Sequence, residues 1–361
     1  MSIAIIGANG FIGTRLVELL HLGGEYKVIP VVRRASGLAL SARFALDWRI
    51  GDALNVESLA AAISDCEAVV HVALGDPRQI EAMPAVLCEA AASTGVKRVI
   101  YLSSASVHGQ APGSDTTEDS PLHCRHAMDY NNAKVRAERA FFRQCAKHRL
   151  EGFALRPGVV FGPRSRWITD LATDLRQRRA WLLGEGDGVC NGIYVDNLVA
   201  AVERCLAAPA DAAGAYLVGE TARVTWSDFY HRVANELGLD PATIHRVPAA
   251  PVFRRTPKET VARLVASRGV QALLPAAPDR LKKFGKHLLA AATAPAPTSD
   301  AWSLPAEPAP RITQELALLQ QCRWQIPSDR AMQRLGYRPV VDFPTAIQRS
   351  LAWLAFAEGR S

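Results

Sequence analysis

The sequence predicts an α/β fold built on a doubly wound parallel sheet, with a smaller C-terminal lobe. Short β-branched segments alternate with helical segments through the first half of the chain. This alternation is typical of right-handed βαβ units, whose strands form a parallel sheet. A glycine-rich stretch, "GANGFIG", follows the first apolar segment directly. The expected fold therefore has its functional residues at the carboxyl ends of its strands.

The alternation assigns each element of the first half. We expect strands at 2–8, 26–34, 44–52, 67–75, 97–104 and 151–163, and helices at 12–24, 56–65, 84–95 and around Tyr130. Beyond about residue 165 the pattern weakens, with helices expected at 168–179, 225–238 and 343–359. Residues 1–165 are thus predicted to form a Rossmann-type nucleotide-binding domain to which 190–205 return, and 166–361 a substrate-binding lobe.

Composition narrows the class of protein. The chain has 361 residues, of which 49% are apolar and 21% charged, as in soluble globular proteins. Its seven cysteines are odd in number and form no Cys-x2-Cys pair, which argues against a disulfide framework or a metal site and favours a reducing compartment. The N-terminus lacks the features of a leader, and no apolar run reaches the length of a membrane span. We expect a cytoplasmic protein.

The net charge of +7 is concentrated in one segment. Residues 253–287 contain nine Lys or Arg and two acids, inside a Pro/Ala-rich insert at about 251–310. Mixed with Val261, Leu264 and Val265, these cations suit a helix on an anionic membrane surface. The alternative is a lid over the substrate lobe with a solvated basic face. No nucleic-acid-binding module accompanies the charge, so a nucleic-acid partner is not expected.

The glycine-rich stretch carries the first functional signal. Gly7, Gly10 and Gly13 lie where the first strand turns into the first helix. Glycines there allow a tight turn and close approach of the backbone to a pyrophosphate at the helix N-terminus. The second strand ends in "VVRRAS", with Arg33 and Arg34 where an NAD site would have an acidic residue. Their guanidinium groups suit a 2′-phosphate, so NADP is the preferred cofactor and NAD the alternative.

Three further strand ends and one helix add candidates. Asp52 could accept from an adenine amino group, Ala73 leaves room for the cofactor, and Ser104 ends the fifth strand. Tyr130 and Lys134 stand four residues apart, hence on one helix face. A cation beside a phenol lowers its pKa, which makes a usable acid/base pair.

Together the motifs resemble the extended short-chain dehydrogenase/reductase superfamily, in particular the NAD-dependent epimerase/dehydratase type. The matching stretches are "GANGFIG", "GD" at 51–52, "YLSSASVHG", "YNNAK", "LRPGVVFGP", "YVDNL" and "LGYRP", in the family's order. The resemblance implies that Tyr130 exchanges a proton, Lys134 binds the nicotinamide ribose and lowers the Tyr130 pKa, and Ser104 binds the substrate oxygen. It also places the cofactor against Gly7, Asn9, Gly10, Phe11, Ile12, Gly13, Arg33, Arg34, Asp52, Ala53, Ala73, Tyr130, Lys134 and Pro157.

Departures from the family's sequence motifs narrow the range of activities that we expect. Ala105 and Ser106 stand where sugar dehydratases have an Asp-Glu pair, which disfavours elimination. Cys190 occupies the position of the arginine that clamps the diphosphate in nucleotide-sugar epimerases. The asparagine that usually follows the "LR" strand is also missing, since Pro157 and Gly158 stand there. These last two features resemble the hydroxysteroid-dehydrogenase and ketone-reductase branch. Arg164 or Arg166 could still hold a phosphate from another angle, so a sugar substrate remains open.

The sequence thus predicts an NADP-preferring ketone reductase acting on a partly apolar small molecule. A nucleotide-sugar epimerase is the alternative, and a non-catalytic NADP-binding redox sensor is the third interpretation. We expect a homodimer, no metal, and peripheral contact with an anionic membrane if the insert is an anchor.

Overall fold

The computed structural model describes residues 1–39, 42–253 and 308–359. Residues 1–249 and 310–361 form one compact unit, and 250–309 form a second. Nearly all of the basic insert, and with it the anchor and lid hypotheses, lies outside the described residues.

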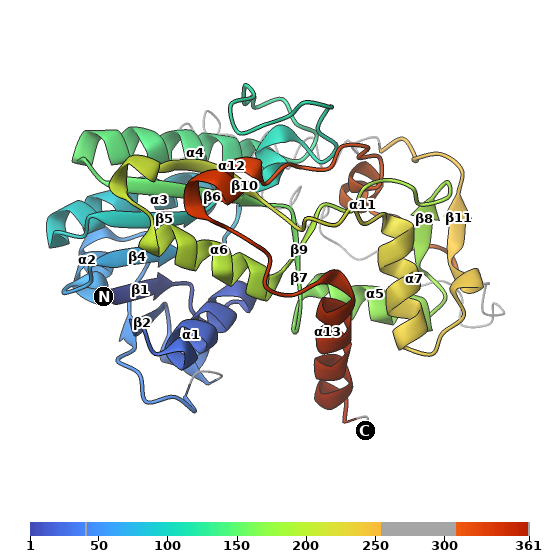
Figure 1. Ribbon diagram of the computed structural model, residues 1–361, viewed down its shortest axis with the longest axis horizontal. Coiled ribbons are helices and arrows are strands. Elements are labelled where there is room, and N and C mark those ends of the chain that lie inside the picture. The colour runs from blue at the N-terminus through green and yellow to red at the C-terminus, as the bar shows by residue number, and fades with distance from the viewer. Residues whose placement is uncertain (40–41, 254–307, 360–361) are drawn as a thin grey trace, which may run out of the picture. The chain divides into compact units, whose positions relative to one another are not determined.

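A seven-stranded, all-parallel sheet forms the centre of this unit (Figure 1), which confirms the predicted fold class. In spatial order its strands are β10 (Gly214–Val218), β6 (Glu151–Pro157), β5 (Arg98–Leu102), β4 (Ala68–His71), β1 (Ser2–Ile6), β2 (Lys27–Val32) and β3 (Arg49–Ile50). The order reverses at β1, where strands added in opposite directions leave a crevice at their carboxyl ends. Strand β10 belongs to this sheet although its residues lie within 166–361, the range predicted for the substrate-binding lobe. The lobe boundary near residue 165 stays a prediction.

Helices cover both faces of the sheet (Figure 1). On one face lie α1 (Phe11–Gly23), α6 (Val195–Ala207) and α12 (Asp329–Leu335), and on the other α2 (Val56–Ile63), α3 (Pro77–Thr94) and α4 (Asp129–His148). Short 3-10 turns occur at η1 (Ala35–Leu38), η2 (Ala105–His108), η3 (Ala210–Ala212) and η4 (Pro241–Thr243). The strands are apolar on both sides because helices bury both faces, as in β1, where Ile3, Ala4 and Ile5 are fully buried.

Helix α3 begins seven residues before the start predicted at residue 84. Asp76 accepts from the amides of Arg78 and Gln79, the Gln79 side chain accepts from the Asp76 amide, and Pro77 occupies the first turn. This capping box fixes the N-terminus at Pro77. Pro84, which we took as the helix start, lies inside the helix.

Smaller elements beyond the sheet form a second apolar cluster. They are β7 (Val159–Phe161), β9 (Gly192–Tyr194), β8 (Trp181–Leu183), β11 (His245–Val247), α5 (Arg166–Arg176), α7 (Trp226–Glu236), α11 (Gln314–Leu319) and α13 (Phe343–Ala357). β7 pairs with β9, and β8 with β11. Phe161 and Phe229 meet edge to face at 5.3 Å in this cluster.

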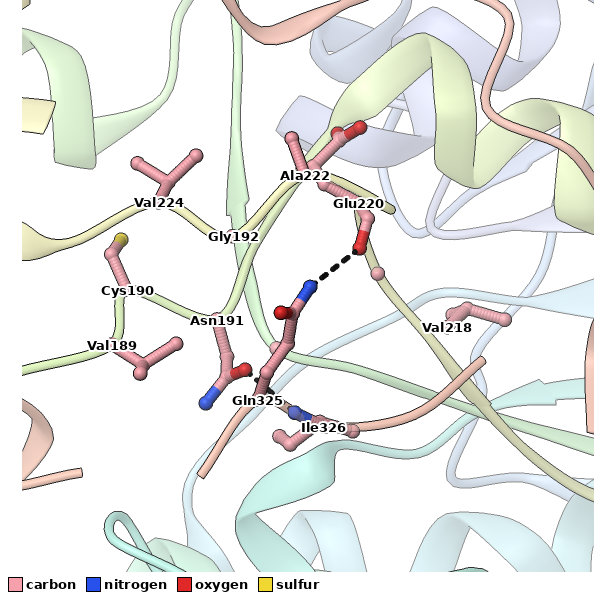
Figure 2. Close-up of a pocket in the computed structure, with 12 residues that line it drawn as sticks. Val189, Cys190, Asn191, Gly192, Val218, Glu220, Ala222, Val224, Gln325 and Ile326 are labelled. Atoms are coloured by element: carbon pink, nitrogen blue, oxygen red, sulfur yellow. Dashed lines mark hydrogen bonds between the residues drawn. The ribbon is translucent and has the colours of Figure 1, made fainter. Parts of the chain in front are cut away.

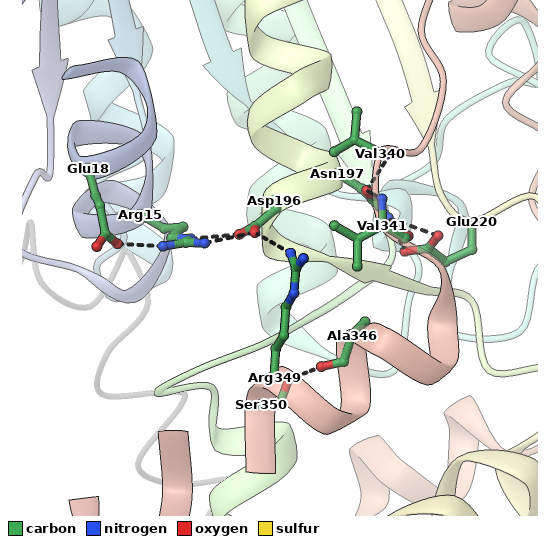
Figure 3. A network of polar contacts seen from close by, with 10 residues as sticks. All are labelled: Arg15, Glu18, Asp196, Asn197, Glu220, Val340, Val341, Ala346, Arg349 and Ser350. Carbon is green, nitrogen blue, oxygen red and sulfur yellow. Dashed lines mark hydrogen bonds and ion pairs between the residues drawn. The ribbon is translucent and has the colours of Figure 1, made fainter. Parts of the chain in front are cut away.

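The "YVDNL" motif connects the helices on the central sheet with the second apolar cluster (Figure 3). Asp196 accepts hydrogen bonds from Arg15 of α1 at 2.6 and 2.8 Å, and Arg349 of α13 lies 3.8 Å away. Asn197 accepts from the amides of Val340 and Val341 and donates to Glu220 at 2.9 Å. Both motif residues are buried, so their role in the structure is to connect α1, α6 and the C-terminal segment.

Within the described ranges, no helix is long and apolar enough to span a bilayer. The same part of the chain contains no group of three His, Cys, Asp or Glu side chains arranged to hold a metal ion.

Candidate active site

The glycine-rich turn is packed so closely that a residue with a Cβ atom would not fit at two of its glycine positions. Gly7 has φ +87°, and a Cβ there would lie 2.7 Å from the backbone of Ala73. A Cβ on Gly13 would lie 2.1 Å from the Gly7 carbonyl oxygen. Helix α1 begins at Phe11 with no side chain capping it, since its N-cap residue is Gly10. Its first amides thus remain available to an anion at the positive end of the helix.

This turn opens onto a cavity of about 520 Å³, which we call the glycine cavity. Ten predicted cofactor residues line it: Gly7, Asn9, Gly10, Phe11, Ile12, Gly13, Arg33, Asp52, Ala53 and Ala73. The wall also includes Leu54, Leu74, Gln79 and Met83, which the motifs did not indicate. Of the other predicted cofactor residues, Tyr130 lines a neighbouring cavity, whereas Arg34, Lys134 and Pro157 line neither.

The two arginines after β2 differ in position. Arg33 is exposed and lines the glycine cavity. Arg34 is exposed and precedes the η1 turn, where its carbonyl accepts from the Gly37 amide at 2.9 Å. Among the described residues neither guanidinium is paired with an acid, so Arg33 offers a free cation at the wall.

Ser104, Tyr130 and Lys134 converge at the carboxyl end of β5. Ser104 begins the η2 turn and accepts from the Ser106 amide at 3.2 Å. Tyr130 and Lys134 lie in the first turns of α4, with the Lys134 Nζ 5.9 Å from the centre of the Tyr130 ring. Nζ donates to the Leu102 carbonyl at 2.8 Å, so β5 fixes the lysine.

The expected lowering of the Tyr130 pKa by Lys134 is not found. Burial and, to a smaller extent, the charge of Glu315 raise the pKa of Tyr130 to about 12, while a hydrogen bond from Ser104 and the charge of Arg166 oppose that rise. Burial also lowers the pKa of Lys134 to about 8. At neutral pH the tyrosine is therefore protonated and the lysine still carries its charge.

Buried polar side chains form a hydrogen-bonded network next to Lys134. Lys134 shares its surroundings with Glu138, which binds Arg156 through hydrogen bonds of 3.0 and 3.1 Å to Nε. Arg156 also contacts His108 Nε2 at 3.1 Å, and its charge together with burial lowers the pKa of His108 to about 4. The paired charges satisfy one another, as buried ions must.

His71 is an exception in this layer. It ends β4, is 1% exposed, and neither ring nitrogen has a hydrogen-bond partner among the residues that the structure describes. Burial and the charge of Lys134 lower its pKa to about 3, so the ring is neutral. The sequence contained no signal for this position beyond its place at a strand end.

A second cavity, of about 670 Å³, opens above Tyr130, and we call it the tyrosine cavity. It shares Phe11, Ile12 and Leu74 with the glycine cavity, so the two adjoin. Ser104, Ser106 and Tyr130 provide hydroxyl groups on its wall. Its apolar side chains include Met128, Val159, Val160, Trp167, Val189, Leu319 and Ile326.

Cys190 does not line the tyrosine cavity. It is 4% exposed, and it borders a separate small pocket with Gly192, Glu220 and Gln325 (Figure 2). Burial raises the pKa of its thiol, so it carries no charge at neutral pH. The adjacent Asn191 lines the tyrosine cavity, but its amide binds the Trp324 carbonyl at 3.0 Å and the Ile326 amide at 2.8 Å.

Comparison with known proteins identifies the family. The model of the NAD dependent epimerase/dehydratase family matches residues 3–219. The chain belongs to this family. Its reductase and dehydrogenase relatives and its epimerase relatives are all members of the extended short-chain dehydrogenase/reductase group, as the motifs indicated.

Three curated relatives of this family illustrate its range. A 3β-hydroxysteroid-dehydrogenase/decarboxylase from Arabidopsis thaliana is 24% identical over 96% of the chain, which spans 61% of that relative's length. A 2-alkyl-3-oxoalkanoate reductase from Shewanella oneidensis is 27% identical, covering 68% of each protein. A 3-diazoavenalumate denitrifying reductase from Streptomyces is 30% identical, over 69% of the chain and 85% of the relative.

Solved structures of other family members share the fold. A dTDP-glucose 4,6-dehydratase from Streptomyces venezuelae, with NAD bound, gives a TM-score of 0.69 at 19% identity over 99% of this chain and 98% of the other. A UDP-glucuronic acid 4-epimerase from Bacillus cereus, in complex with NAD, gives 0.67 at 16% identity over 99% of both. These likenesses show the fold, and the family whose model matches the chain is described as NAD dependent.

Proposed function

We propose that this chain is an NADP-preferring oxidoreductase that interconverts a secondary alcohol and a ketone, acting chiefly as a reductase on a partly apolar substrate. The observation that carries the proposal is the position of Tyr130. It lies with Ser104 on the wall of a largely apolar cavity, and that cavity adjoins the glycine cavity.

The glycine cavity fits a dinucleotide. The close packing at Gly7 and Gly13, together with the uncapped start of α1, suits a pyrophosphate. Arg33 would bind the 2′-phosphate of NADP, Asp52 the adenine, and Lys134 the nicotinamide ribose. When bound, the nicotinamide supplies or accepts the hydride.

Tyr130 acts as the proton donor in this proposal. With a pKa of about 12, its phenol is protonated at neutral pH and can donate to a substrate oxygen. Ser104 holds the same oxygen by a hydrogen bond. After donation, a hydrogen bond from Ser104 stabilises the phenolate that remains, while the opposite charges of Glu315 and Arg166 largely offset each other. Because the Tyr130 phenol is protonated before the reaction, it is ready to donate a proton, which is the step that ketone reduction requires.

The test is a ketone panel with NADPH consumption monitored, comparing wild type with Tyr130→Phe. We expect the rate to fall by about 10²- to 10⁴-fold, since only the proton donor is removed. NADPH affinity, measured by fluorescence titration, should stay nearly unchanged. Tyr26→Phe, which changes a tyrosine outside both cavities, should match wild type. Retained activity in Tyr130→Phe would remove this residue from the mechanism.

A nucleotide-sugar epimerase remains the second candidate. It is favoured by Arg164 and Arg166 on the wall of the tyrosine cavity and by a UDP-glucose 4-epimerase from Vibrio cholerae that is 26% identical over 67% of the chain. An epimerase returns the hydride to the same substrate. Product formed from a UDP-sugar without net NADPH consumption would therefore favour it over the reductase.

A further inference from the structure

Arg164 is an arginine without a partner on the wall of the tyrosine cavity. Its Nη1 atom is buried and has no hydrogen-bond partner, and within the described ranges no acid forms an ion pair with it. Burial lowers its pKa, which reflects the cost of keeping this charge out of water. Arg164 as a whole is half-buried, but its Nη1 end is out of contact with water and no group among the described residues compensates it, which is costly unless a ligand supplies the opposite charge.

The backbone holds this side chain in an uncommon conformation. Arg164 has φ +72°, in the left-handed region that residues other than glycine seldom adopt. It lies in the "GPRS" turn that leads from β7 into α5, and Ser165 begins that helix by accepting from the Trp167 amide at 3.3 Å. Such strained positions are concentrated at ligand sites, where the side-chain direction they impose has a use.

The charges on the wall suggest what the ligand carries. The charged residues lining the cavity, among those described, are Arg164, Arg166 and Glu315. Arg166 binds Glu315 at 2.8 Å, so those two charges cancel and Arg164 leaves the wall with a single positive charge. That matches one carboxylate better than the diphosphate of a nucleotide sugar. The remaining wall is mainly apolar, which suits an aliphatic or aromatic body.

Ser106 provides a second polar group without a partner. Ser106 lines the same cavity, and its Oγ is buried without a hydrogen-bond partner in the described part of the chain. Ser106 and Arg164 thus each contribute an uncompensated polar atom to the wall of one largely apolar cavity, which indicates that a polar ligand completes them.

From this arrangement we infer that Arg164 binds a carboxylate on the substrate, so that the enzyme selects apolar molecules bearing one negative charge beside the reacting oxygen. The inference rests on the proposed oxidoreductase function for the identity of the reaction, but not for the binding itself. Arg164 thereby determines substrate specificity, whereas Tyr130 supplies the proton.

The test is calorimetric binding of decanoate and of decanamide, which has the same chain and no charge, to NADPH-loaded protein. Wild type should prefer decanoate. Arg164→Asn should weaken decanoate binding by about ten- to a hundredfold, because a charge-assisted hydrogen bond is lost. Decanamide binding should stay within about twofold, since its apolar contacts are retained. Asparagine tolerates the left-handed backbone, so this variant should fold.

A matched control is available. Arg178 also has a left-handed backbone, with φ +52°, but it is exposed and lies outside the cavity. Arg178→Asn should therefore leave the preference for decanoate intact, while Arg164→Lys should restore part of it by returning the charge. Equal binding of decanoate and decanamide by wild type, or an unchanged preference in Arg164→Asn, would overturn the inference.

UDP serves as a third probe. If UDP binding depends on Arg164 while decanoate binding does not, the arginine serves a nucleotide and the carboxylate assignment is wrong. Since all readouts are binding, they are independent of turnover. A protein that reduces no ketone but binds decanoate through Arg164 would refute the proposed function and leave this inference standing.

Discussion

The two adjoining cavities are built in different ways. The glycine cavity is formed by residues 6–83, at the ends of consecutive strands, and six of its lining residues are glycine or alanine, which leave backbone accessible. The tyrosine cavity combines segments from Phe11 to Ile326, and most of its lining residues have larger side chains. Backbone at strand ends recurs wherever the fold does, whereas side chains from distant segments can vary independently. One cavity thus suits a common cofactor and the other a particular substrate.

Lys134 belongs to neither the cofactor cavity nor the substrate cavity. It lines neither of them and is buried next to Tyr130. Its pKa falls from 10.5 to about 8 on folding. Between these values the unfolded chain binds more protons than the folded one, so stability should rise as pH increases from about 8 toward 10.5. Below pH 8 both states are protonated, and the full cost of burying the ammonium is present.

Lys134→Met should remove this dependence. We expect the difference in unfolding free energy between wild type and variant to change by up to about 3 kcal/mol across that pH range, in favour of wild type at high pH. Urea unfolding at pH 7.5 to 10 measures it, with the exposed Lys97→Met as a control for loss of a surface charge. Parallel pH profiles for wild type and Lys134→Met would show that burial does not depress this pKa. NADPH affinity should also fall if Lys134 binds the ribose.

Gly13 tests the backbone wall of the glycine cavity. Alanine at Gly13 would bring its Cβ to 2.1 Å from the Gly7 carbonyl, so the turn must shift. We expect a loss of about 1–3 kcal/mol in stability from this overpacking, and weaker NADPH binding because the helix start moves. Gly23→Ala in the same helix meets nothing within 4 Å and should be neutral or slightly stabilising. Urea unfolding and fluorescence titration compare the two; equal effects would refute the packing argument.

The sequence predicted the local parts of the molecule well. The parallel sheet and the glycine turn follow from strand-to-helix alternation and short spacings, which depend on neighbouring residues alone. The early start of α3 was missed although its signal, Asp76 with Pro77 and Gln79, is present in the sequence. The three-residue strands β8 and β11 are too short to show a periodicity.

The wall of the tyrosine cavity was largely beyond prediction. Ser104 and Tyr130 were found through motif spacing, and Arg164 was named only as a candidate phosphate ligand. Among the described residues it has no acidic partner, whereas Arg166 binds Glu315, which is 149 positions away, and both facts result from tertiary packing. The raised pKa of Tyr130 likewise results from burial by tertiary packing, which the four-residue spacing to Lys134 did not reveal.

The smallest expected effect separates the two arginines after β2. Arg33 lines the glycine cavity and Arg34 does not, although both were equally good candidates from the sequence. Arg33→Ala should raise the Michaelis constant for NADPH by about tenfold, because an exposed guanidinium contributes on the order of 1.4 kcal/mol to a phosphate contact. The constant for NADH should hardly change. Arg34→Ala should have less effect on both, which makes it the matched control.

Salt dependence gives an independent check on the same contact. Added salt screens charges over roughly 8 Å at physiological ionic strength, so NADPH binding should weaken with salt more in wild type than in Arg33→Ala. If wild type uses NADH and NADPH equally well, the preference for NADP is wrong and Arg33 faces solvent without a ligand. A larger effect of Arg34→Ala than of Arg33→Ala would instead mean that the residue outside the cavity binds the phosphate, and that the wall of the glycine cavity rearranges around its cofactor.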